Sequence, residues 1–239
     1  MPRPSLRAAL HVAGSVLGTS ASIVVDQALH RVSIERTNDR LRSWARGAIA
    51  SAGIDLRTEG SVPPGGPFVL MSNHQSHLDI ASLYATLGPE IRMVAKKELF
   101  RFPFFGQAMR ATGFIELDRQ HRDRAIASLQ GAGTLLDKGL HLWIAPEGTR
   151  SVTGELGPFK KGGFMVALET GAPILPIGIH GTRDALPVHA LRLRRGQRVG
   201  VVIGDPIPTT GQSRDSLMAT TRDAIASLVA RARVLTLAP

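Results

Sequence analysis

Short apolar runs alternate with helix-like stretches along the chain after residue 55. The apolar runs predict strands at 67–72, 91–95, 114–117, 140–145, 173–179 and 198–204. Amphipathic or Ala-rich stretches predict helices at 81–87, 124–138, 162–170 and 214–233. Strands that alternate with helices are typical of βαβ units. The expected fold class is therefore α/β, with a mostly parallel central sheet flanked by helices, and ligands should bind where the strands end.

The N-terminal part of the chain has a different pattern. Residues 8–25 contain no Asp, Glu, Lys or Arg, and their length is at the lower edge of what crosses a bilayer. Ser, Thr, Gly and His dilute this segment, which favours an interfacial or packed helix over a span. Because Arg3 and Arg7 precede it, a secretory signal peptide also stays open.

A second N-terminal segment predicts a clear amphipathic helix. Its apolar face consists of Leu41, Trp44, Ala45, Ala48 and Ile49, and its arginines lie off that face. Such a helix either lies on an anionic bilayer or packs on its own domain with a solvated Arg face, and the sequence leaves both open. We divide the chain into an N-terminal helical membrane-associating segment, residues 1–55, and a domain built on the sheet, residues 56–239.

The chain is strongly basic, with a formal net charge of +10, and this favours anionic partners. Its basic clusters at 31–46 and 192–198 are not interleaved with aromatic residues, as a base-stacking surface would be. We therefore expect anionic lipid or a phosphorylated substrate, and no nucleic acid. The chain has no cysteine, which excludes thiol nucleophiles, disulfides and thiolate metal sites.

The stretch SNHQSHLDI, residues 72–80, carries the first candidate chemistry. His74 follows a predicted strand, and a neutral imidazole is the natural general base for a hydroxyl. A base of this kind needs its second nitrogen held by a carboxylate. Asp79 can do so across a strand-to-helix turn, whereas on a single helix the two side chains would point about 140° apart. Asn73 can brace that turn.

Three other interpretations of the stretch remain open. Asp79 could simply favour a helix N-terminus. His74, His77 and Asp79 could bind a metal, although such a site needs further ligands. Ser76 could act as a covalent nucleophile, but its surroundings lack the G-x-S-x-G turn.

Further polar groups follow other predicted strands. Glu147, Gly148, Thr149 and Arg150 come after the strand at 140–145 and suit a phosphate group. Arg119 follows the strand at 114–117 and adds a second cation. GPFKKGGF, residues 157–164, adds two lysines beside glycines that permit close backbone approach. Taken alone, EGTR could be a turn with a surface ion pair.

Together, NHQSHLD, KKELFRFPFFG with FIELDR, PEGTRS with PFKKGGF, and APILPI resemble the glycerolipid acyltransferase family of lysophosphatidate acyltransferases, over about residues 60–205. The resemblance implies that 56–239 is an acyltransferase domain. It implies transfer of a fatty acyl group from acyl-CoA or acyl-carrier protein to the free hydroxyl of lysophosphatidate, which gives phosphatidate for phospholipid synthesis. It also implies that no metal, cofactor or covalent intermediate takes part.

The resemblance assigns roles to particular residues. His74 corresponds to the base and Asp79 to its orienting carboxylate. The acceptor phosphate corresponds to a set of five residues, Arg119, Glu147, Gly148, Thr149 and Arg150. Pro176 belongs to a block concerned with the acyl side. Relatives commonly carry an aromatic residue at the position of His77.

The resemblance also implies partners and a location. The partners are the lipid bilayer, a lysophospholipid and the acyl donor, and the location is the cytoplasmic face of a membrane. Three alternatives stay open: a sister acyltransferase for another lysolipid or glycerol-3-phosphate, a non-catalytic lipid-binding protein on the same fold, and a metal hydrolase.

Overall fold

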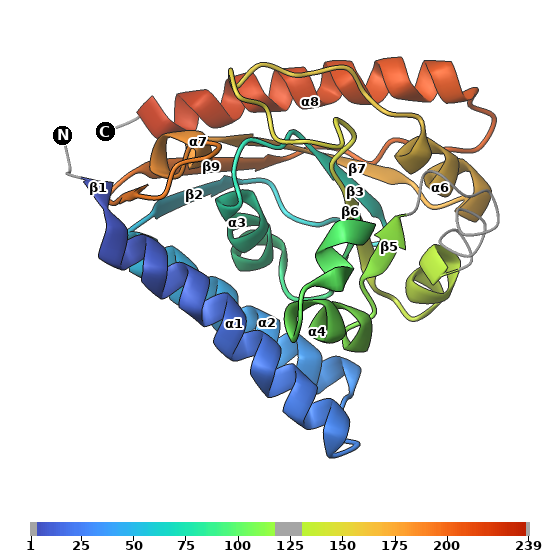
Figure 1. The fold of residues 1–239 in the computed structure, drawn as a ribbon. Coiled ribbons are helices and arrows are strands. Elements are labelled where there is room, and N and C mark those ends of the chain that lie inside the picture. The colour runs from blue at the N-terminus through green and yellow to red at the C-terminus, as the bar shows by residue number, and fades with distance from the viewer. Residues whose placement is uncertain (1–3, 118–130, 238–239) are drawn as a thin grey trace.

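The computed structural model describes residues 4–117 and 131–237. Within these residues one seven-stranded sheet runs through the molecule, in the order β2-β9-β7-β3-β6-β4-β5 (Figure 1). The strands are β2 Asp55–Glu59, β3 Val69–Ser72, β4 Ile91–Lys96, β5 Ile115–Leu117, β6 His141–Ile144, β7 Ile174–His180 and β9 Arg198–Ile203. Every neighbouring pair is parallel except β7 and β9. The predicted mostly parallel α/β architecture is confirmed.

The sheet contains each strand that the apolar runs predicted, and one more. Strand β2, with the sequence DLRTE, lies at the edge of the sheet beside β9. It was missed because an edge strand of this kind is largely solvent-accessible and needs no apolar run. A second, two-stranded ribbon joins β1 Pro4–Ser5 to β8 Leu193–Arg194.

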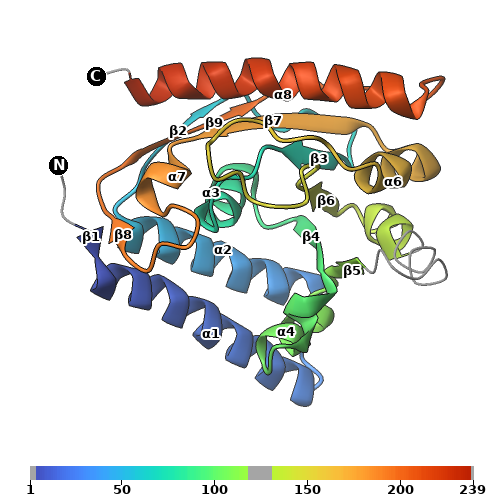
Figure 2. The ribbon, with the colours of Figure 1, turned by 45° about the horizontal axis from the view of Figure 1, so that its top comes forward.

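One face of the sheet is covered by α8 Arg214–Leu237, drawn in red in Figures 1 and 2. This helix lies directly on the backbone of β7 and β9. A Cβ at Gly178 would come within 2.2 Å of the Leu228 carbonyl carbon, and one at Gly200 within 2.3 Å of the Ala232 oxygen. Glycine is therefore required at both positions for the helix to approach this closely. The shorter α6 Gly162–Thr170 shares the buried apolar cluster on this face.

The opposite face is covered by α2 Ile34–Ala52 and α3 Leu78–Leu87. Leu41 and Ala45 of α2 belong to the same buried cluster as Leu70 and Ile177 of the sheet. The apolar face that the sequence predicted on α2 is therefore packed on its own domain. It is not free to enter a bilayer.

Helix α1 Leu6–Ala28 forms the outermost layer, against α2 and opposite α8 (Figures 1 and 2). A buried carboxylate joins the two helices, since Asp26 accepts from Arg40 Nε at 2.5 Å and from Arg36 Nε at 2.9 Å. The hydrogen bond from Arg40, which has the larger effect, and the one from Arg36 hold the pKa of the Asp26 carboxyl well below its usual range. Part of the basic cluster at 31–46 thus serves the helical hairpin itself.

Helix α1 keeps a large apolar surface on its outside. It is the one helix in the described part of the chain that is long and apolar enough to cross a membrane, judged by length and composition. Its exposed large hydrophobic side chains are Leu6, Leu10, Leu17 and Val25. The neighbouring 3-10 turn η1 Lys97–Arg101 and helix α4 Phe105–Ala111 bury Phe100 but leave Phe102 and Phe104 exposed at 58% and 60%.

Candidate active site

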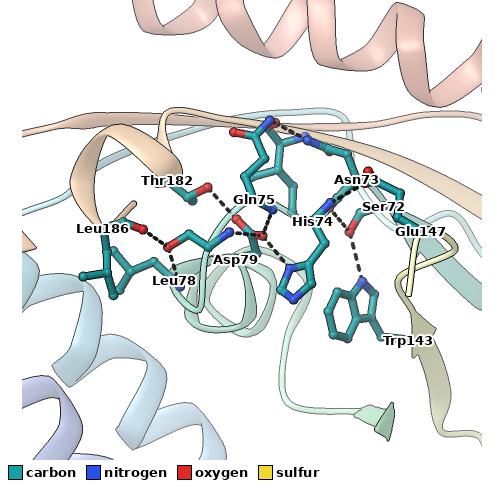
Figure 3. A network of polar contacts seen from close by, with 12 residues as sticks. Ser72, Asn73, His74, Gln75, Leu78, Asp79, Trp143, Glu147, Thr182 and Leu186 are labelled. Carbon is teal, nitrogen blue, oxygen red and sulfur yellow. Dashed lines mark hydrogen bonds and ion pairs between the residues drawn. The ribbon is translucent and has the colours of Figure 1, made fainter. Parts of the chain in front are cut away.

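The candidate site lies where three adjacent parallel strands end. In the order β7-β3-β6, these strands are followed by Thr182, His74 and Glu147, respectively (Figure 3). Carboxyl ends of parallel strands meet at one edge of a sheet, so side chains far apart in sequence converge there. Arg150 lies further along the same segment after β6, beyond Glu147.

His74 and Asp79 form a dyad across the turn between β3 and α3. His74 Nδ1 lies 2.7 Å from Asp79 Oδ2, and the two side chains are 14% and 0% exposed. The convergence that the spacing predicted is therefore present. Asp79 Oδ2 also accepts from the backbone N–H groups of Gln75, at 2.7 Å, and Ser76, at 2.9 Å. The same carboxylate thus binds both the turn that opens α3 and the imidazole. Asp79 therefore has a place at the start of the helix and also pairs with His74.

The second oxygen of Asp79 has a partner from a distant segment. Thr182 Oγ1 donates to Asp79 Oδ1 at 2.5 Å. Thr182 is fully buried and opens the short helix α7 Thr182–Ala185. Gly181 before it has φ +92, and a Cβ there would lie 2.1 Å from the Arg198 oxygen, so only glycine fits this close turn. Sequence analysis missed Thr182, because its only local signal is a Gly-Thr pair after a strand.

The contacts of Asp79 determine which His74 nitrogen carries the proton. Four donors meet the two carboxylate oxygens, which an ionised carboxylate can accept. Since Asp79 only accepts, His74 Nδ1 is assigned as the N–H donor. Nε2 then carries the free lone pair and is the basic atom of the dyad.

The walls around His74 are also fixed by hydrogen bonds. The Asn73 amide pairs with Ile179 in both directions, with its oxygen and its nitrogen each 2.8 Å from the backbone of β7. Asn73 therefore braces the turn, as predicted. The Trp143 ring lies edge-on to the His74 ring, with centroids 5.5 Å apart, and Trp143 Nε1 donates to Ser72 Oγ at 3.0 Å.

Glu147 occupies a supporting position beside the dyad. It is 4% exposed, and its Oε1 accepts from the His74 backbone N–H at 3.0 Å. Its Oε2 accepts from the Gly157 N–H at 2.8 Å. Both oxygens are thus occupied by the backbone of the chain. Its assignment to phosphate binding stays a prediction from sequence, whereas the structure shows it holding His74.

The rest of the EGTR sequence is more open to solvent. Gly148 turns the chain with φ +68, Thr149 is exposed and Arg150 is half-buried. Arg150 forms no hydrogen bond or ion pair with the residues that the structure describes. Partial burial lowers the pKa of His77, and the charges of Arg150 and His74 lower it further. Arg150 therefore acts electrostatically on His77, and the N–H of the next residue, Ser151, donates to the His74 carbonyl at 2.7 Å.

Two other residues predicted from the sequence are Arg119 and Pro176. Arg119 falls outside the described residues. Pro176 is buried in the middle of β7, on the same face of the sheet as Gly178, where its ring packs near Gly204. That position is the face covered by α8, so the acyl-side role of Pro176 stays a prediction.

The metal alternative required further ligands near His74, His77 and Asp79. In residues 4–117 and 131–237, no group of three or more His, Cys, Asp or Glu side chains is placed to hold a metal ion.

The fold and site define an α/β protein with a His–Asp dyad at the carboxyl ends of its central strands. The family model described as Acyltransferase matches residues 53–180, which is more than half of the chain. The chain belongs to the acyltransferase family, and the resemblance found in its motifs is confirmed.

Similar proteins carry a more specific description. A chloroplastic 1-acyl-sn-glycerol-3-phosphate acyltransferase of Brassica napus is 38% identical over 160 residues, which is 67% of this chain and 46% of that protein. The alpha form of 1-acyl-sn-glycerol-3-phosphate acyltransferase from Homo sapiens is 34% identical over 167 residues, 70% of this chain and 59% of that protein. The chain thus spans about half the length of the curated relatives it matches.

A solved structure is similar over nearly its whole length. The crystal structure of the 1-acyl-sn-glycerophosphate (LPA) acyltransferase PlsC from Thermotoga maritima superposes with a TM-score of 0.78 at 25% identity. The match covers 95% of each chain, so it includes the N-terminal helices and α8 as well as the sheet.

The contacts of Asp79 predict an unusual result for Asp79→Asn. Three donors converge on Oδ2, so the amide oxygen should take that place. The amide nitrogen would then donate to Thr182, whose hydroxyl can also accept. His74 should keep its proton on Nδ1, and ¹⁵N NMR of the imidazole should show the same tautomer as the wild-type protein. A proton moved to Nε2 would show that Oδ2 is not held in this way.

Proposed function

We propose that this chain transfers a fatty acyl group from a thioester, acyl-CoA or acyl-carrier protein, to the free hydroxyl of lysophosphatidate, with phosphatidate as product. The observation that carries the proposal is the His74–Asp79 hydrogen bond of 2.7 Å, which leaves Nε2 as a base. The names of the similar proteins support this acceptor. Charge supports it too, because the chain is basic and Arg150 precedes Ser151, whose N–H donates to the His74 carbonyl at 2.7 Å.

The chemistry follows from the state of the dyad. Nε2 of His74 takes the hydroxyl proton of the acceptor while its oxygen attacks the thioester carbonyl carbon. A C–O bond forms and the carbonyl oxygen becomes an oxyanion. Collapse of this intermediate breaks the C–S bond, and the departing sulfur receives the proton from the imidazolium. A thiol is a good leaving group because its pKa is low compared with that of an alcohol.

Asp79 contributes through its charge as well as its position. The imidazolium that forms during attack lies 2.7 Å from a buried carboxylate, and an opposite charge at this distance stabilises it. The donors on Asp79 keep the carboxylate in place before the reaction begins. No metal or covalent intermediate is needed for these steps.

Cations on the connection between β6 and α6 are the candidates to bind the acceptor phosphate. Arg150 is half-buried beside the site, and Lys160 and Lys161 are exposed on the segment that follows it. The sequence assigns Arg119 to the same phosphate. A sister acyltransferase that acts on another lysolipid or on glycerol-3-phosphate is the alternative, because its acceptor would present the same hydroxyl.

A panel of acceptors tests the function. Purified protein is given one acyl-CoA with lysophosphatidate, other lysophospholipids or glycerol-3-phosphate, and the products are identified by mass. Phosphatidate should be the main product. His74→Ala should lower its rate by roughly 100- to 10,000-fold, the value of a lost general base, while circular dichroism stays unchanged. A folded His74→Ala protein with near-normal turnover would disprove the catalytic assignment.

Removal of the Arg150 charge should impair the acceptor side of the reaction. A charge-assisted hydrogen bond is worth about 1.5–3 kcal/mol, so Arg150→Ala should raise the KM for lysophosphatidate about 10- to 150-fold. The KM for acyl-CoA should change little. Monoacylglycerol, which lacks the phosphate, is the control acceptor. An equal rise in KM for both acceptors would show that Arg150 does not bind the phosphate.

The acceptor is a bilayer lipid, so we propose that the chain works on a membrane surface, on its cytoplasmic side. The exposed apolar side chains of α1 and the exposed Phe102 and Phe104 provide the contact. These elements lie on the side of the molecule opposite α8 (Figure 1).

Substitutions on α1 test this surface. The double variant Leu10→Ser with Leu17→Ser replaces side chains that are 62% and 60% exposed. It should reduce cosedimentation with anionic vesicles without lowering the melting temperature. Val234→Ser with Leu237→Ser is the matched control on α8, where the side chains are 64% and 71% exposed. Equal loss of binding in both double variants would argue against α1 as the contact.

A further inference from the structure

A single arginine of α8 holds the segment that follows the EGTR turn. Arg222 donates from Nη1 to the Gly157 carbonyl at 2.6 Å and from Nη2 to the Leu156 carbonyl at 3.0 Å. Its guanidinium carbon lies 5.2 Å from the centre of the Phe159 ring. A planar guanidinium can make two hydrogen bonds and one stacking contact at the same time, which an ammonium group cannot do.

The held segment is connected to the dyad through Glu147. The Gly157 N–H donates to Glu147 Oε2 at 2.8 Å, and Glu147 Oε1 accepts from the His74 N–H at 3.0 Å. A Cβ at Gly157 would lie only 3.1 Å from Oε2, so the backbone approaches the carboxylate closely. Gly157 is therefore held on one side by Glu147, through its N–H, and on the other by Arg222, through its carbonyl.

The next residues of the segment are the two lysines that the proposed function assigns to the acceptor phosphate. Lys160 and Lys161 follow Phe159 directly, and the Lys160 N–H donates to the Pro146 carbonyl at 2.7 Å. Phe159 also stacks with Phe164 of α6, with ring centroids 6.1 Å apart. Both lysines thus follow directly on the segment 156–159, between its contacts with Arg222 and the start of α6.

We propose that Arg222 is a positioning residue for the acceptor side of the site, acting through residues 156–161. This inference rests on the proposed function, and it adds a residue outside the span 53–180 that the family model matches. Arg222 touches neither dyad residue, and its hydrogen bonds go to backbone carbonyls of the segment. Its effect should therefore fall on acceptor saturation, and donor saturation should be unaffected.

The test compares two lysine substitutions on the same helix. Arg222→Lys keeps the charge but loses the two-carbonyl contact. Arg231→Lys makes the same chemical change at a position that pairs with Glu59 on the edge strand β2. Hydrogen exchange of backbone amides is measured first, because it needs no substrate. Exchange at Gly157 and Lys160 should be roughly tenfold faster in Arg222→Lys, from the loss of about one charge-assisted hydrogen bond, and unchanged in Arg231→Lys.

Steady-state kinetics then separates positioning from general stability. Arg222→Lys should raise the KM for lysophosphatidate about tenfold and leave the KM for acyl-CoA unchanged. Arg231→Lys should leave both KM values unchanged. A merely structural role of Arg222 would lower the melting temperature without separating the two KM values, and that result would overturn the proposal. Unchanged exchange at Gly157 and Lys160 would overturn it as well.

Gly157→Ala provides a second variant that leaves α8 intact. The added methyl group should push against Glu147 Oε2 and reproduce the rise in acceptor KM. If Gly157→Ala and Arg222→Lys differ in which KM they raise, the two residues do not act through one segment and the proposal fails. A wild-type protein that acylates no lysophosphatidate would refute the proposed function. The exchange measurement would still decide whether Arg222 holds the segment.

Discussion

The carboxylate of Asp79 is the contact on which the rest of the site depends. It is fully buried and accepts four hydrogen bonds, from the His74 ring, the backbone of Gln75 and Ser76, and the Thr182 hydroxyl. These donors come from the turn after β3 and from the start of α7. A buried charge is stable only when it is fully hydrogen-bonded, so each of these segments must be in place for the others to hold. The turn that opens α3 and the orientation of the His74 ring therefore depend on the same carboxylate.

A second buried carboxylate, that of Glu147, connects the backbone of His74 to a segment further from Asp79. Glu147 holds the backbone of His74 and the backbone of Gly157, and Arg222 holds the far side of Gly157. Asp79 thus fixes the ring of His74 while Glu147 fixes its main chain. Groups that are oriented before the substrate arrives need no reorganisation during the reaction. This preorganisation is the main source of electrostatic catalysis in enzymes. The dyad lies at strand ends, whereas Glu147 and Gly157 lie on the connection between β6 and α6, which is held by hydrogen bonds.

The helical hairpin combines two kinds of surface. Helix α2 gives its apolar face to the sheet, and Asp26 of α1 binds two arginines of α2. The outside of α1 remains apolar and exposed. Since α2 shares the core of the sheet, removal of the whole N-terminal segment would open that core. Membrane contact is better examined by substitutions on α1 alone.

The sequence by itself determined the α/β class, the six strands with apolar runs, the convergence of His74 with Asp79, and the family. The strands and the dyad are local features, because an apolar run and a five-residue spacing across one turn each lie within neighbouring positions. The family was recognised from four motifs in order over about residues 60–205. Only the tertiary structure decided the rest. Thr182 reaches Asp79 across 103 positions, and Arg222 reaches Gly157 across 65. The sequence of α2 is compatible with an apolar face against a bilayer or against a protein core. In the structure that face packs on the sheet. Such contacts join distant segments by packing, and no short stretch of sequence records which partner a buried polar group will meet.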